Sequence, residues 1–185
     1  MTCHKKKAKK CSGIVLFEDE ASFWVDGTLY KTWARINQQP YVESYGQRKT
    51  AHVYGAISLS DARFTYLFAD KFNGYSFLKF LTQIVSRCSP NKVFLIIDNA
   101  PWHNLHEDGK KWLNQNRCKL ELFRLPKYSP EFNPMEPVWK TTRKFATHNQ
   151  FHRSAEDRDL ALLKTFKMFQ RRPMLISAHV SRWDK

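Results

Sequence analysis

The chain has 185 residues, a length that suits one domain with a hydrophobic core of its own. Hydrophobic residues make up 42% of it and aromatic residues 15%, a composition that excludes an intrinsically disordered chain. Lys and Arg number 31 against 17 Asp and Glu, and the formal net charge of +14 indicates either nucleic acid or an anionic membrane surface as partner. No apolar run approaches the ~20 residues that span a bilayer, and none follows the N-terminal lysines, so we expect neither a membrane segment nor a secretory signal.

The chain begins with a basic segment. Residues 4–10 carry five lysines and no acid, and because like charges repel, we expect residues 1–12 to form a disordered tail that either contacts phosphates or stays solvated. The four cysteines form no Cys-x-x-Cys pair, so we interpret them as free thiols in a reducing compartment.

The first half of the chain predicts three strands. The apolar run at 14–18 is rich in β-branched residues, as in a strand buried on both faces, and an irregular segment follows to about Gln47. Residues 52–59 and 63–69 have the pattern of strands, and the short link at 60–62 joins them into a hairpin.

The next part of the chain alternates helices and strands. Apolar residues at helical spacing predict a helix over 75–87, and a buried strand at 92–98 follows it. A helix at 107–116 and a short strand at 120–123 complete this part.

Two helices close the predicted order of elements. Asn133 has the features of an N-cap with Pro134 at the first helical position, and apolar residues follow at helical spacing to Ala146. Ser154 is the predicted cap of a last helix. The order indicates one α/β domain over 13–185, in which a mixed sheet, made of an antiparallel hairpin and parallel strands, is flanked by helices.

Acidic residues follow two of the buried strands. One apolar run leads into Glu18-Asp19-Glu20 and another leads into Asp98. If the two strands are parallel neighbours, Asp19 and Asp98 stand side by side at one edge of the sheet, where their charges repel unless a proton or a cation lies between them. Side-chain alternation puts Asp19 on the face opposite Glu18 and Glu20, and does not say which of the three acids faces the cation.

A third acid, Glu136, lies at the start of the helix that follows Asn133. It can reach back to the N–H of the cap residue, a structural role that the helix dipole also favours. Alternatively it joins Asp19 and Asp98, and three carboxylates at one sheet edge form an all-oxygen site suited to Mg²⁺ or Mn²⁺.

Three motifs resemble the catalytic domain of a DDE transposase of the mariner superfamily, within its bacterial insertion-sequence branch. They are Phe-Glu-Asp-Glu-Ala-Ser-Phe-Trp at 17–24, Asp-Asn-Ala-Pro-Trp-His at 98–103 and Leu-Pro-Lys-Tyr-Ser-Pro-Glu-Phe-Asn-Pro-Met-Glu-Pro-Val-Trp at 125–139. The resemblance extends from about residue 13 to residue 150.

This resemblance implies a ribonuclease H-like fold in which Asp19, Asp98 and Glu136 are the catalytic acids and bind two Mg²⁺ or Mn²⁺ ions. It further implies cleavage of phosphodiester bonds at transposon ends, strand transfer into a target duplex containing TA, and a homodimer as the working unit. The expected location is the bacterial cytoplasm, in association with the nucleoid.

Other residues of these motifs have candidate supporting roles. Asn99 is a candidate turn residue beside Asp98, and His103 either hydrogen-bonds a phosphate or the metal-binding carboxylates, or caps and packs the loop after the strand. Seven basic residues outside the tail are candidate phosphate contacts. They are Arg48, Lys49, Lys110, Lys111, Lys140, Arg143 and Lys144.

The chain departs from the family in one respect. Family members usually carry helix-turn-helix modules before the catalytic domain, whereas here about a dozen residues precede the first strand. We therefore expect the helix-turn-helix region to be absent, because the chain is either the product of a truncated reading frame or the second product of a split gene whose other polypeptide supplies the module. The alternatives are a truncated, non-autonomous relic, a DNA-binding inhibitor of a full-length transposase, or another ribonuclease H-like nuclease.

Overall fold

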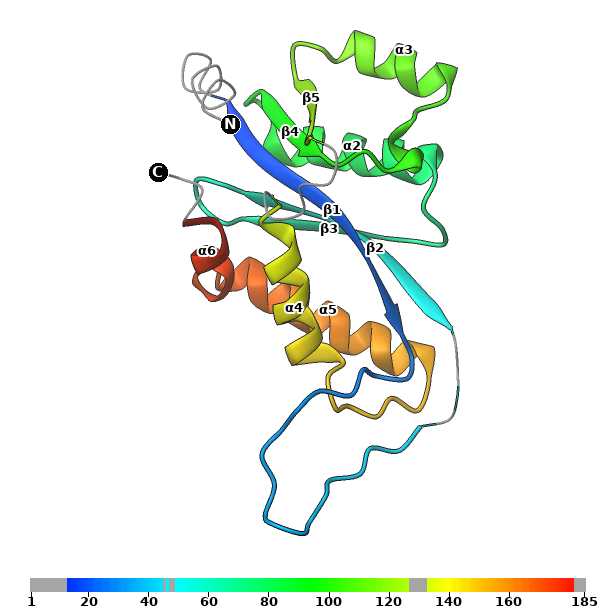
Figure 1. Cartoon of the computed structure of the whole chain (residues 1–185). Coiled ribbons are helices and arrows are strands. Elements are labelled where there is room, and N and C mark those ends of the chain that lie inside the picture. The colour runs from blue at the N-terminus through cyan, green and yellow to red at the C-terminus, as the bar shows by residue number, and fades with distance from the viewer. Residues whose placement is uncertain (1–12, 45, 47–48, 127–132, 182–185) are drawn as a thin grey trace.

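The computed structural model describes residues 13–44, 46, 49–126 and 133–181. The predicted basic tail, Arg48 and part of the third motif, at 127–132, lie outside the described residues. The described part is a central sheet with helices on both faces (Figure 1).

The sheet has five strands in the order β3-β2-β1-β4-β5. β2 pairs antiparallel with both β1 and β3, whereas β4 pairs parallel with β1 and β5. The mixed sheet predicted from the sequence is therefore confirmed, including its hairpin. The strands are β1 (Ile14–Trp24), β2 (Thr50–Ser58), β3 (Phe64–Ala69), β4 (Val93–Ile97) and β5 (Leu120–Arg124).

The first strand is longer than the sequence predicts. β1 does not end at residue 18 but continues to Trp24, because its backbone stays paired with β2 as far as Thr50. The parallel pairing with β4 stops earlier, at Phe17 and Ile96. Beyond that point β1 runs on beside β2 alone, so the sheet has a step where β4 ends.

The helices form two layers, one on each face of the sheet (Figure 1). One layer contains α2 (Gly74–Cys88) and α3 (Glu107–Gln115), and the short 3-10 helix η1 (Pro101–His103) precedes α3. The other layer contains the helices of the C-terminal part (Figure 1). They are α4 (Met135–Ala146), α5 (Ala155–Arg171) and α6 (Met174–Ser181).

The two faces of β1 bury different side chains. Phe17, Ala21 and Phe23 belong to the core cluster that also contains residues of α4 and α5. Leu16 belongs to the cluster that contains residues of α2. Odd-numbered residues of β1 therefore face α4 and α5, and even-numbered residues face α2.

The predicted helix starts are partly correct. Ser154 caps α5, since its side chain accepts a hydrogen bond from the Asp157 N–H. α4 begins one residue later than predicted, with Pro134 as its N-cap. Asn133 still helps to close this end, because its Oδ1 accepts from the Met135 N–H at 3.0 Å.

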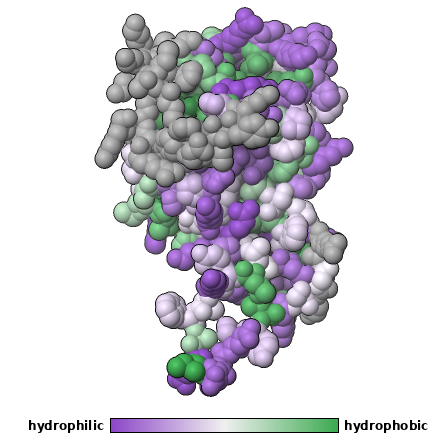
Figure 2. Space-filling model, viewed as in Figure 1, coloured by the Kyte–Doolittle hydropathy of each residue, from purple (hydrophilic) through white to green (hydrophobic). Residues whose placement is uncertain are grey.

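Between β1 and β2, the described residues 25–44 project away from the body of the molecule (Figure 1). They expose large apolar side chains such as Trp33, which is 100% exposed, and Figure 2 shows apolar patches among the polar residues of this projection. Arg158 of α5 lies at its base, buried, and its Nη1 donates to the carbonyl oxygens of Phe23 at 3.0 Å and Lys49 at 2.7 Å. Among the described residues, no helix is long and apolar enough to cross a membrane.

Replacing Arg158 tests whether this contact stabilises the base of the projection. Arg158→Met removes both hydrogen bonds and leaves the buried Phe23 carbonyl without this donor, so we expect a loss of about 2 kcal/mol in the free energy of unfolding, measured by urea denaturation. Lys164→Met, on an exposed position of the same helix, is the control and should change it little. Equal stability of the two variants would contradict the assigned role.

Candidate active site

Asp19 and Asp98 meet at the step in the sheet where β4 ends. Asp19 lies in the middle of β1, and Asp98 directly follows β4. Together with Glu20 they offer carboxylate oxygens that all lie within 4.8 Å of one another. The expected proximity of Asp19 and Asp98 is therefore observed, although Asp19 is within a strand and not at its end.

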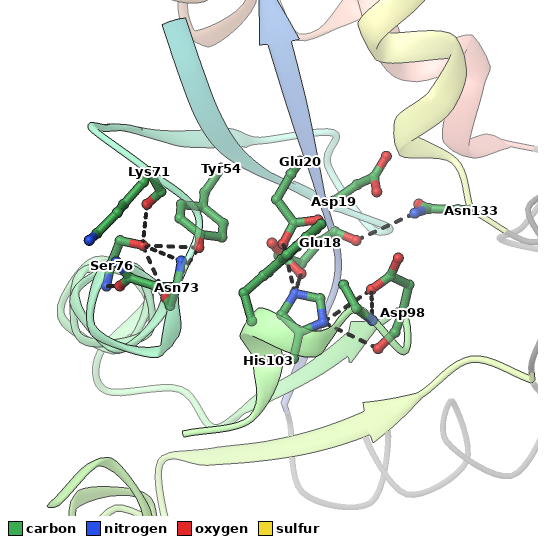
Figure 3. A network of polar contacts seen from close by, with 12 residues as sticks. Glu18, Asp19, Glu20, Tyr54, Lys71, Asn73, Ser76, Asp98, His103 and Asn133 are labelled. Carbon is green, nitrogen blue, oxygen red and sulfur yellow. Dashed lines mark hydrogen bonds and ion pairs between the residues drawn. The ribbon is translucent and has the colours of Figure 1, made fainter. Parts of the chain in front are cut away.

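Asp19 points toward α4, as odd-numbered positions of β1 do (Figure 3). Its Oδ2 accepts a hydrogen bond from the Trp139 indole N–H at 3.1 Å. Burial and, after it, the neighbouring charge of Glu20 raise the pKa of Asp19 to about 7. A carboxylate held in this way has an unbalanced negative charge that a cation would stabilise.

Gly55 makes the contact between Trp139 and Asp19 possible. It is the direct partner of Asp19 on β2, and a Cβ placed there would lie 2.5 Å from Cη2 of the indole. Trp139 therefore lies over a strand position that has no side chain. Glycine is required here by the close approach of the ring, since any larger residue would displace it.

Asp98 is held by its own turn. Its Oδ1 accepts from the Ala100 N–H at 2.7 Å, and Nδ1 of His103 lies 3.1 Å from the same oxygen. The hydrogen bond from His103 lowers the pKa of Asp98 in spite of partial burial. Asn99 donates to the Leu125 carbonyl at 2.7 Å, and so ties this turn to the end of β5.

Glu18 and Glu20 point to the opposite face of β1, toward His103 (Figure 3). Nε2 of His103 lies 2.8 Å from Glu20 Oε1 and 3.2 Å from Glu18 Oε2. Glu18 is fully buried, and within the described part of the chain neither of its oxygens makes a well-directed hydrogen bond. Burial, followed by the charge of Glu20, raises the pKa of Glu18 well above its usual value.

His103 is surrounded by acids on both sides. Burial alone would lower the pKa of its imidazole, but the contacts with Asp98, Glu18 and Glu20 outweigh it and raise the pKa to about 12. The imidazole contacts these carboxylates and also packs in the loop after the strand, because Nδ1 lies 3.2 Å from the Asp98 carbonyl oxygen and the ring lies against Phe77.

Glu136 is exposed in the first turn of α4. Among the described residues, the two sets of acids and histidines whose ligand atoms lie within 4.8 Å do not include it. The predicted capping box had Asn133 as its cap and Glu136 at the third helical position, whereas the structure has Pro134 as the N-cap, which places Glu136 at the second position. Glu136 does lie three residues before Trp139, on the same side of the helix as the ring that contacts Asp19.

The six candidate phosphate contacts among the described residues differ in their surroundings. Lys110 and Lys111 of α3 form ion pairs with acids one turn earlier, at 2.7 Å and 3.7 Å. Lys140 and Lys144 are exposed and follow Glu136 at intervals of four residues along α4. Arg143 lies over the Phe23 ring at a distance of 5.3 Å. Lys49 lies at the base of the projection, where its carbonyl oxygen accepts from Arg158.

Sequence reasoning missed the role of Trp139, which the helical pattern assigns to the core. Its position three residues after Glu136 was a usable signal, because residues at that spacing share a helix face. Nothing in the sequence indicated Gly55, since its importance depends on which ring crosses the sheet there.

The fold and this acidic site define a ribonuclease H-like domain. The family model described as a DDE superfamily endonuclease matches residues 14–159, so the chain belongs to the DDE superfamily of endonucleases. No curated protein sequence matched the chain.

Solved structures of similar fold come from transposases and retroviral integrases. The mariner Mos1 paired-end complex with Mg has a TM-score of 0.63 at 15% identity, covering 99% of this chain and 58% of that one. The Mos1 paired-end complex with the left transposon end has a TM-score of 0.59 at 15% identity, covering 97% and 60%. The HTLV-2 integrase catalytic core with magnesium, in its dimeric form, has a TM-score of 0.53 at 9% identity, covering 84% of each chain.

At sequence identities this low, the similarity to these structures concerns the fold alone. The chain spans about 60% of the length of the Mos1 chains that it resembles. The donor set fits a divalent metal on chemical grounds, because carboxylate oxygens of Asp19, Glu20 and Asp98 converge within 4.8 Å and such oxygens are the ligands that Mg²⁺ and Mn²⁺ prefer.

Substituting Gly55 tests the contact between Trp139 and the sheet. Gly55→Ala forces the indole away and should lower the free energy of unfolding by about 1–3 kcal/mol, as overpacking does. In a Trp139→Phe background the atoms nearest the new Cβ are absent, so the same substitution should cost less. An equal cost in both backgrounds, measured by chemical denaturation, would show that the ring and Gly55 are not coupled.

Metal binding can be measured without DNA. Mn²⁺ at about 100 times its dissociation constant stabilises a folded protein by about 2.7 kcal/mol, so we expect the thermal unfolding midpoint of the wild type to rise when Mn²⁺ is added. Asp98→Asn should remove most of this rise, whereas Asp108→Asn, an exposed acid of α3, should retain it. An undiminished rise in Asp98→Asn would place the ion elsewhere.

Proposed function

We propose that this chain is the catalytic domain of a DNA transposase, which cleaves phosphodiester bonds at transposon ends and joins the freed ends to target DNA. The observation that carries the proposal is the convergence of Asp19 and Asp98 at the step in the sheet, in a basic chain of the DDE endonuclease superfamily. The paired-end complexes of Mos1, which share the fold, support transposition over other endonuclease functions.

The proposed ligands of two Mg²⁺ or Mn²⁺ ions are Asp19, Asp98 and Glu136. When bound, such ions activate water or a DNA 3′-hydroxyl for attack and stabilise the leaving oxygen. Asp98 is accessible for this role, with 44% of its side chain exposed. Glu136 would join the other two by reorientation of its exposed side chain, from a helix turn that Trp139 holds beside Asp19.

The start of α4 is tied to the strand that carries Asp19. Asn133 donates from Nδ2 to the Glu18 carbonyl at 3.4 Å while its Oδ1 accepts from Met135. Together with the bond from Trp139 to Asp19, these contacts fix the first turns of α4 relative to β1. They support a fixed position for the backbone of Glu136 beside the other acids.

DNA is the proposed partner, and α4 is the proposed surface for its phosphates. Lys140 and Lys144 extend from Glu136 along one exposed face of the helix, with Arg143 beside them. Lys110 and Lys111 are weaker candidates because nearby acids already pair with them. We further propose a homodimer, a separate helix-turn-helix polypeptide for recognition of the ends, and a location at the bacterial nucleoid.

Cleavage itself is tested by nicking of a supercoiled plasmid in the presence of Mn²⁺. The variants Asp19→Asn, Asp98→Asn and Glu136→Gln should each abolish nicking, because each removes a charge that holds the ions. Glu107→Gln, at an exposed acid of α3, is the control and should nick at the wild-type rate. Nicking by purified Asp98→Asn at the wild-type rate would rule out the proposed site.

If Lys140 and Lys144 contact DNA phosphates, removing them makes the affinity for DNA depend less on salt concentration. Each phosphate contact contributes about −0.9 to the slope of log K against log salt concentration. Removing Lys140 and Lys144 by double alanine substitution should therefore reduce the slope by about 2 with random-sequence DNA, measured by fluorescence anisotropy. The matched double variant at Lys110 and Lys111 should leave the slope unchanged. A slope that falls only in this second variant would show that DNA binds at α3 and not at α4.

A further inference from the structure

Two buried acids of β1, Glu18 and Glu20, are not among the proposed metal ligands, although a Glu20 oxygen lies within 4.8 Å of oxygens of Asp19 and Asp98. Glu18 and Glu20 flank Asp19 but point to the other face of the strand, where their side chains are 0% and 5% exposed. Burying carboxylates is costly unless a donor or a cation compensates them. His103 lies between these acids and Asp98, and it contacts all three (Figure 3).

On the side of Asp98, Nδ1 of the imidazole faces two oxygens of the same residue, carboxylate Oδ1 at 3.1 Å and the backbone carbonyl oxygen at 3.2 Å. Oδ1 also accepts from the Ala100 N–H at 2.7 Å. These two donors direct Oδ1 into the turn. The other carboxylate oxygen, Oδ2, points away from the imidazole (Figure 3), and a cation would bind there.

On the other side, the imidazole is anchored to β1. Nε2 lies 2.8 Å from Glu20 Oε1 and 3.2 Å from Glu18 Oε2, and the Trp102 indole N–H also donates to Glu20. The ring packs on Phe77 of α2, with centroids 4.5 Å apart. The imidazole cannot turn without losing its partners at both nitrogens and this ring contact.

We propose that His103 is a positioning residue for metal binding: anchored through Nε2 to Glu18 and Glu20, it uses Nδ1 to hold the Asp98 carboxylate with Oδ2 directed at the cation. The proposal rests on the proposed function for the assignment of Asp98 as a metal ligand. It also gives Glu18 and Glu20 a role, which is to orient the imidazole from the face of β1 that Asp19 does not occupy.

Two conservative variants separate positioning from simple structural support. The side-chain amide nitrogen of an asparagine at this position lies close to where Nδ1 of histidine lies. The amide nitrogen of a glutamine lies close to the position of Nε2. His103→Asn therefore keeps the donor to Asp98 and loses the donor to the glutamates, whereas His103→Gln does the reverse.

The readout is the Mn²⁺ concentration that half-saturates the metal-free protein, measured by isothermal titration calorimetry. Loss of an oriented partner behind a metal ligand weakens binding by about 10–100-fold. We expect His103→Gln to raise the half-saturating concentration about tenfold or more and His103→Asn to raise it less. Equal values for the two variants, or a larger loss in His103→Asn, would overturn the proposal, since a purely structural role predicts that satisfying the buried glutamates matters more.

A second measurement uses the wild type alone, so it does not depend on the folding of a variant. In the ¹⁵N-histidine spectrum of the protein, addition of Mg²⁺ should shift the ring nitrogens of His103 as Asp98 becomes a ligand. His152, a buried histidine that contacts the Ala146 carbonyl, is the internal control and should not move. Unchanged His103 signals at saturating Mg²⁺ would overturn the proposal.

These outcomes are distinct from a failure of the proposed function. Neither calorimetry nor the histidine spectrum involves DNA, so the positioning role can hold in a protein that fails to nick a plasmid. Conversely, a protein that nicks DNA while the two His103 variants bind Mn²⁺ equally would retain the proposed function and lose this inference. A wild type that binds no Mn²⁺ would contradict both.

Discussion

Repulsion among carboxylates is the constraint on which the rest of this site depends. Four acids lie within two segments, Glu18 to Glu20 on β1 and Asp98 after β4, and unscreened charges at this separation destabilise the fold. Alternation along β1 separates the charges, since Asp19 faces α4 while its two neighbours face α2. His103 balances the charges of Glu18 and Glu20, and we propose that cations balance those of Asp19 and Asp98.

The position of α4 is set by the same strand. Trp139 crosses β2 at Gly55 and donates to Asp19, so the helix approaches the sheet at the level of the acid. Asn133 adds a second connection at the start of the helix, to the Glu18 carbonyl. A glycine, a tryptophan and an asparagine, none of them acidic, thus fix the start of α4 against the strand that carries Asp19.

Much of the fold could be predicted because its signals are local. The apolar run before Asp98 and the hairpin pattern after residue 50 are fixed by burial, whereas the proximity of Asp19 and Asp98 was expected only if their strands were parallel neighbours, as the structure shows them to be. The length of β1 could not be predicted, because acids at 18–20 suggest a strand end while the backbone remains paired with β2. Alternation correctly separated Asp19 from its neighbours, but the partners of each face depend on tertiary packing.

The roles of individual site residues were harder to predict for the same reason. His103 had two open interpretations, and the contact with Glu18 and Glu20 could be recognised only once β1 and η1 were seen side by side. Trp139 follows a core pattern along α4, yet its indole N–H serves Asp19. Such contacts join elements that are distant in sequence, so the pattern along one element does not name the partner on the other.

The most direct test of the central claim is anomalous diffraction from crystals of this protein grown with Mn²⁺. The account predicts anomalous peaks between Asp19 and Asp98, with the Glu136 side chain turned toward them and Asp98 bound through Oδ2. A Mn²⁺-saturated crystal without a peak at these two carboxylates, or with its peak bound by other residues, would contradict it.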